Sequence, residues 1–142
     1  KKSHKFYLFD LGIRNNLLKD FRPFSERDDQ GAILESYVYL HLSFQLQPNM
    51  EIRFWRTKKG QEVDFIVLKN RVPLPVEVKS KLSDQSLPSG MAAFLRTYPE
   101  APCGIVYNLN QTGTTLHEGR EVHFKKIESC VRLEWMEQVT PV

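Results

Sequence analysis

The sequence is poor in cysteine and has no long apolar run. Cys103 and Cys130 are its only cysteines, and they form no CxxC motif and have no histidine at metal-ligand spacing, which argues against a zinc site. Cys103 lies in the apolar run PCGIVYN, where we expect a buried free thiol. No apolar run approaches the roughly 20 residues that span a bilayer, and no signal peptide opens the chain. We therefore expect an intracellular, cytoplasmic protein without a membrane partner.

The charge is also small. A net charge of +3 and a pI near 8.9 permit contact with a polyanion without demanding it. The composition, 41% hydrophobic and 11% aromatic over 142 residues, is that of an ordinary globular domain, so we expect residues 1–142 to form a single domain. Because the chain begins with Lys1 and not with Met, we expect a domain cut from a longer protein.

Periodicity predicts alternating strands and helices. The expected strands are residues 5–10, 51–58, 62–68, 75–81, 103–109 and 119–127. The expected helices are 11–18 (or a turn), 31–46 and 86–99, with Asp28 or Asp29 placed to cap the second, and residues 129–139 fit either a strand or a short helix. Short connections favour an antiparallel meander of three strands, and the helical crossover favours a parallel fourth strand. The expected fold is α/β, with a mixed central sheet flanked by helices.

The stretch GQEVDFIVLKNRVPLPVEVKS, residues 60–80, places charged residues on two adjacent strands. Regular alternation puts Val63, Phe65 and Val67 on one face of the first strand and leaves Asp64 on the other. The same rule leaves Glu77 and Lys79 together on the second strand. Because neighbouring strands lie about 4.8 Å apart, Asp64 and Glu77 can converge on one hard cation. Without a cation or a proton, carboxylates this close repel each other.

Two further side chains fit the same site. Lys79 returns to the face of Glu77 and can orient a water beside a metal ion. Glu35 lies between apolar stripes of the helix expected over residues 31–46, formed by Ile33, Tyr37, Leu40 and Phe44 and by Leu34, Val38 and Leu42. Because an unpaired buried carboxylate is costly, a helix that packs over the strands would bring Glu35 to the site as a further ligand of the metal or of a water.

These residues resemble a known signature. Glu35 on a helix, Asp64 on a strand and Glu77-Val78-Lys79 on the next strand are similar to the three-part motif of the PD-(D/E)XK nuclease superfamily, whose restriction-endonuclease-like core has the order α-β-β-β-α-β. More narrowly, GAILESYVYLHL, FWRTKKGQEVDFIV and VEVKS resemble the DUF4143 domain, the C-terminal domain of prokaryotic P-loop ATPases. The likeness covers most of residues 5–108. Val63 stands where the superfamily motif has proline.

The resemblance implies a function. It implies a metal-dependent phosphodiesterase fold with Asp64 and Glu77 as ligands of Mg²⁺ (or Mn²⁺), Glu35 as an auxiliary acid and Lys79 beside the attacking water. It implies DNA as a substrate and an N-terminal ATPase domain in the same parent protein, which would form any oligomer. This chain has no G-x-x-x-x-G-K-[ST] motif, so the ATP site would lie in that other part.

Alternatives stay open at several residues. A lone E-x-K pair is usually solvated, and Glu35 can form a buried salt bridge, for example to Lys79. The basic residues near the first hairpin can bind phosphates or merely keep a turn soluble; they are Arg53, Arg56, Lys58 and Lys59. Trp55 can stack on a base or belong to the core, and we assign no catalytic histidine. At the level of function, the alternative to a nuclease is a catalytically inactive module of the same fold that binds DNA or a protein and regulates the ATPase.

Overall fold

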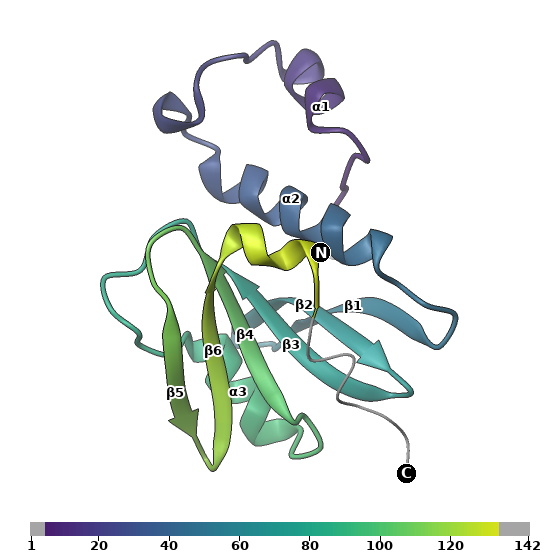
Figure 1. The fold of residues 1–142 in the computed structure, drawn as a ribbon, viewed down its shortest axis with the longest axis vertical. Coiled ribbons are helices and arrows are strands. Elements are labelled where there is room, and N and C mark those ends of the chain that lie inside the picture. Colours follow the sequence, from purple (N-terminus) through teal and green to yellow (C-terminus); the bar gives the residue numbers. More distant parts are fainter. Residues whose placement is uncertain (1–4, 134–142) are drawn as a thin grey trace.

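A mixed six-stranded sheet is the centre of residues 5–133, the part of the chain that this computed structural model describes (Figure 1). The elements are α1 (Leu11–Leu18), the 3₁₀ helix η1 (Phe24–Glu26), α2 (Gln30–Phe44), β1 (Met50–Arg56), β2 (Glu62–Lys69), β3 (Val72–Val78), α3 (Ser89–Thr97), β4 (Cys103–Asn108), β5 (Gly113–His117), β6 (Arg120–Lys126) and the 3₁₀ helix η2 (Ile127–Val131). The strand order is β1-β2-β3-β4-β6-β5. In these residues no helix has the length and apolar character that a membrane span needs.

The sheet topology confirms the predicted connections. β1, β2 and β3 form an antiparallel meander, and β4 pairs with β3 in parallel after the α3 crossover. β6 then pairs with β4 in parallel, and β5 pairs with β6 antiparallel at the edge. From α2 to β4 the element order is α-β-β-β-α-β, as expected.

Each face of the sheet has its own core. α2 and η2 cover one face and α3 covers the other (Figure 1). Leu34, Val38 and Leu42 of α2 are buried on the first face, as predicted, whereas Phe44 is exposed although the pattern assigned it to an apolar stripe. Phe44 comes two residues after the fully buried Leu42, and at 3.6 residues per turn this places it on the nearly opposite side of α2, away from the packed face. On the opposite face, Met91 and Phe94 of α3 are buried.

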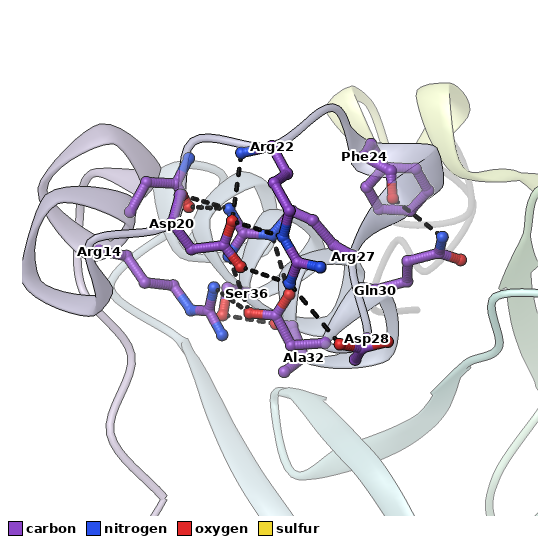
Figure 2. A network of polar contacts seen from close by, with 11 residues as sticks. Arg14, Asp20, Arg22, Phe24, Arg27, Asp28, Gln30, Ala32 and Ser36 are labelled. Carbon is purple, nitrogen blue, oxygen red and sulfur yellow. Dashed lines mark hydrogen bonds and ion pairs between the residues drawn. The ribbon is translucent and has the colours of Figure 1, made fainter.

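An ion-pair network holds the start of α2 against the segment after α1 (Figure 2). The Arg27 guanidinium is buried, and its Nε and Nη2 donate to the Asp29 carboxylate at 2.8 and 2.9 Å. Nη1 of Arg27 donates to the carbonyl oxygen of Asp20 at 2.6 Å, and Arg14 donates to Asp29 at 2.8 Å. Asp29 is the N-cap residue of α2 but makes no side-chain cap bond, because its carboxylate is taken by these arginines. The network fixes the direction of α2 and therefore the place of Glu35.

The strand expected over residues 5–10 is not formed. Residues 5–8 and 10 have no secondary structure and residue 9 is a bend. Side-chain packing takes the place of strand pairing: the ring of Tyr7 stacks on Tyr39 of α2 at a centroid distance of 4.3 Å. The segment therefore lies against α2 and not in the sheet.

The third strand is displaced from its predicted range. β3 runs over Val72–Val78 and not over 75–81, so Lys79 follows the strand and does not belong to it. Its start was missed because Pro73 and Pro75 indicate a turn. Both prolines lie where β3 pairs with β2 alone, since pairing with β4 begins at Val76, and proline is tolerated where one side of a strand is free.

The C-terminal half holds two further differences. β5, a polar edge strand, has no counterpart among the predicted elements because its exposed, threonine-rich sequence has no apolar face. Cys130 is buried and Cys103 is only partly buried, and both are free thiols. Of the open stretch 129–139, residues up to 131 belong to η2, and residues 134–139 lie outside the described part.

Two glycines provide a test of the α3–β2 contact. A Cβ on Gly90 would lie 1.8 Å from the carbonyl oxygen of Glu62, whereas a Cβ on Gly31 in α2 meets nothing within 4 Å. We predict that Gly90→Ala lowers the free energy of unfolding by about 1–3 kcal/mol, because overpacking forces the backbones apart. Gly31→Ala is expected to raise it by up to about 1 kcal/mol, since alanine favours helix. Urea unfolding measures both, and equal effects would contradict the close approach.

Candidate functional site

A β-bulge at the start of β2 lies next to Asp64. In the β1–β2 pair, Arg53 faces Ile66 but Trp55 faces Val63, so two steps on β1 match three on β2. The extra residue breaks the alternation. Val63 packs in the α3 core, whereas Phe65 packs in the α2 core. The prediction that Val63 and Phe65 share a face was therefore wrong, and bulges of this kind re-aim side chains next to functional sites.

Asp64 lies where β2 and β3 separate. The paired residues of these strands end at Phe65 and Val76. Beyond that point the Asp64 Oδ2 accepts the backbone N–H of Val78 at 2.8 Å. The side chain is buried, with the residue only 9% exposed. Burial, together with the nearby Glu77 carboxylate, raises the pKa of Asp64 to about 7.

Glu77 is the second buried carboxylate. It is 3% exposed, and its Oε1 accepts a hydrogen bond from Lys79 Nζ at 2.7 Å. Its Oε2 is buried and has no hydrogen-bond partner among the described residues. Burial raises the pKa of Glu77 although Lys79 acts to lower it. A buried carboxylate oxygen without a partner is rare and costly. The ion pair with Lys79 satisfies Oε1 of Glu77 and leaves Oε2 without a donor or a cation.

Glu35 meets Asp64 through a lysine that sequence reasoning missed. Lys5 Nζ lies 2.9 Å from Glu35 Oε1 and 3.9 Å from Asp64 Oδ1. The Tyr7 hydroxyl donates to the same Glu35 oxygen, and burial followed by this bond raises the pKa of Tyr7. Glu35 thus forms a salt bridge, as the alternative interpretation allowed, but its partner is Lys5. Lys79 pairs with Glu77 instead. Nothing in the local sequence around Lys5 signals a contact with residues 30 and 59 positions away.

Asp64 links two ion pairs, Lys5–Glu35 and Lys79–Glu77. Its carboxylate interacts electrostatically with both Glu77 and Glu35. Asp64 lines a cavity of about 750 Å³, while Glu77 and Lys79 line a neighbouring one of about 330 Å³. Gly60 and Glu62 line both cavities, so the two spaces meet at the end of the first hairpin.

The larger cavity carries part of the predicted basic group. Arg56 and Lys58 line it, together with Phe54 and Lys5. Arg53 does not; its guanidinium pairs with Glu51 at 2.8 Å. Lys59 is also absent from the lining. Trp55 lines the cavity as well, but its ring packs edge-on against Phe94 and near Tyr98, as expected of a core tryptophan.

The donor set fits a hard cation held by few protein ligands. Within residues 5–133 no cluster of three or more His, Cys, Asp or Glu side chains is placed to hold a metal ion. Mg²⁺, however, is usually bound through one or two carboxylates, with water and substrate phosphates completing its octahedron. Asp64 and Glu77 supply two carboxylates. A cation between them would satisfy the unpartnered Oε2 of Glu77 and relieve the repulsion between the two carboxylates.

Comparison with known families gives one match. The model of the family described as "Domain of unknown function (DUF4143)" matches residues 30–127, from the start of α2 into η2. No curated protein and no solved structure matches the chain. The matched range contains Glu35, Asp64, Glu77 and Lys79, and it leaves out Lys5 and Tyr7.

The raised pKa of Asp64 predicts a pH-dependent stability. The folded pKa of about 7 exceeds the unfolded value of about 3.9. Only the folded state therefore holds this proton between these pH values, and its contribution to stability is lost as pH rises from 4 to 7. Asp64→Asn, which keeps an acceptor for Val78, should raise the free energy of unfolding by about 1–3 kcal/mol at pH 8 and change it little at pH 4.

Urea unfolding at the two pH values measures this effect, with Asp28→Asn as the control because Asp28 is exposed. A gain at pH 8 no larger than the gain at pH 4 would contradict the burial of a charged Asp64.

Proposed function

This chain belongs to the DUF4143 family, and we propose that it is a PD-(D/E)XK nuclease-like domain that hydrolyses phosphodiester bonds of DNA with Mg²⁺ or Mn²⁺. The observation that carries this proposal is the buried pair Asp64 and Glu77, one oxygen of which has no partner. Two charged carboxylates at the point where β2 and β3 separate cost stability unless a cation joins them or one of them takes up a proton. A cost of this kind at a cavity is typical of functional sites.

Each residue of the site has a role in the proposal. Asp64 and Glu77 would hold the cation, which when bound polarises a phosphoryl oxygen and lowers the pKa of a bound water. Lys79 Nζ, held by Glu77 at 2.7 Å, orients the attacking water. Glu35, on the other side of Asp64, serves as the auxiliary acid. Arg56 and Lys58 hold backbone phosphates in the larger cavity, because a row of cations neutralises phosphates independently of sequence.

A second candidate function is a catalytically inactive module of the same fold that regulates an attached ATPase. Two ion pairs favour this function, because Glu35 is already paired with Lys5 and Glu77 with Lys79. In that case the site would be a structural ion-pair cluster, and the domain would bind DNA or a protein partner. The attached P-loop ATPase itself is proposed from the sequence resemblance alone.

Plasmid nicking separates the two functions. With Mg²⁺ or Mn²⁺ we predict nicking by the unmodified protein, loss of activity in Asp64→Ala, and a fall of about 10²–10⁴-fold in Lys79→Ala, the usual contribution of a group that activates the nucleophile. Glu51→Gln, on the exposed side of β1, is the matched control and should keep full activity. Equal activity in all four proteins would point to a contaminating nuclease, and no activity in any of them would favour the inactive module.

DNA binding tests the cavity independently of cleavage. Fluorescence anisotropy with a labelled duplex, measured without metal over a range of salt concentrations, should show weaker binding for Arg56→Glu and for Lys58→Glu. Loss of a phosphate contact should reduce the slope of log K against log salt by about 0.9. Arg53→Glu is the matched control, since Arg53 lies outside the cavity lining. If neither cavity substitution changes the DNA affinity, the cavity is not a nucleic-acid interface, and a protein partner becomes the remaining candidate.

A further inference from the structure

The segment before α1 carries an ammonium group into the carboxylate site. Lys5 Nζ contacts Glu35 at 2.9 Å and lies 3.9 Å from Asp64. The segment forms no strand or helix at this point. It is anchored by Tyr7, whose hydroxyl donates to Glu35 and whose ring stacks on Tyr39. Lys5 itself is 41% exposed, so its flexible side chain can leave Glu35 without disturbing the core.

The position of the Lys5 ammonium disfavours the binding of a metal ion at Asp64. The Asp64 Oδ2 is occupied by the Val78 N–H, so Oδ1, the oxygen nearest Lys5, is the one left for a metal. The other free oxygen of the site is Oε2 of Glu77. A divalent ion that contacts Asp64 Oδ1 therefore comes close to the Lys5 ammonium. Like charges repel more strongly beside a buried carboxylate such as Asp64 than in bulk water, so the affinity for the ion is lowered while Lys5 stays in place.

The same lysine faces the cavity in which a phosphate would bind. Lys5 lines the cavity of about 750 Å³ together with Arg56, Lys58 and Asp64. A backbone phosphate held by Arg56 and Lys58 would offer Lys5 a second anionic partner. Lysine suits such an exchange, because its ammonium is a point charge on a flexible stem.

We propose that Lys5 is an exchangeable counter-cation that couples nucleic-acid binding to metal binding. In the free protein it neutralises Glu35 and Asp64 and keeps the affinity for a divalent ion low. When a phosphodiester enters the cavity, Lys5 moves to a phosphate oxygen, and the ion binds Asp64 and Glu77 without repulsion. The two ligands then raise each other's affinity by the same factor. This inference rests on the proposed function, since it requires that Asp64 and Glu77 bind a cation.

Calorimetric titration with Mn²⁺ tests the coupling, with and without a 12-base-pair DNA duplex, whose integrity is checked on a denaturing gel after each run. Without DNA, Lys5→Met should bind Mn²⁺ about five- to tenfold more tightly than the unmodified protein, within the usual range of such couplings. DNA should tighten Mn²⁺ binding to the unmodified protein by a similar factor and to Lys5→Met by less than twofold. Lys59→Met, the same loss of charge at the neighbouring hairpin turn but outside the cavity lining, should leave the affinity without DNA within twofold of the unmodified protein.

The outcomes are separable. If Lys5→Met and the unmodified protein bind Mn²⁺ equally, or Lys5→Met binds it more weakly, the counter-cation role is overturned while the metal site stands. If no variant binds Mn²⁺ with or without DNA, the proposed function fails and the inference fails with it. Lys5→Gln, which keeps a hydrogen-bond donor without the charge, should behave like Lys5→Met. Circular dichroism confirms that each variant is folded before titration.

Discussion

The whole site depends on one hydrogen bond, which the Val78 N–H donates to the Asp64 carboxylate. β2 and β3 stop pairing just before it, and the carboxylate takes the place of a main-chain acceptor. Because Asp64 closes this gap, it is buried between Glu35 on one side and Glu77 on the other. The bulge in β2 and the end of β3 are therefore parts of one arrangement that holds carboxylates closer together than their charge favours.

The sequence was sufficient for the order of the elements from α2 to β4, but not for β5, which has no predicted counterpart, or for residues 5–10, which form no strand. Helical periodicity in Leu34, Val38 and Leu42 identified the buried face of α2, and the short connections identified the antiparallel meander. These signals are local, and local patterns determine helices, hairpins and the parallel strand after a crossover. The start of β3 was predicted wrongly because Pro73 and Pro75 indicate a turn. Proline is tolerated there since β3 has only one neighbouring strand at these residues, and that depends on where β4, far along the chain, begins to pair.

The sequence was enough to name four candidate residues, but not to show how they are arranged or that Lys5 contacts them. Asp64, Glu77 and Lys79 were identified by spacing, and Glu35 by a charge among apolar neighbours. Strict alternation, however, puts Val63 on the face of Phe65, whereas Val63 packs in the α3 core and Phe65 in the α2 core. The bulge behind this difference has no distinct sequence signal here. The partner of Glu35 was also missed, because Lys5 reaches it only through the packing of Tyr7 on α2. Contacts between distant segments depend on the assembled fold.

Both proposals require that Asp64 and Glu77 together hold one divalent cation. An anomalous difference map from crystals grown with Mn²⁺ tests it most directly, because the map locates the ion without relying on activity. We expect one peak within coordination distance of Asp64 Oδ1 and Glu77 Oε2, with Lys5 moved away from Asp64. A well-ordered crystal at saturating Mn²⁺ with no peak between these two oxygens, and with Lys5 still on Glu35, would contradict it.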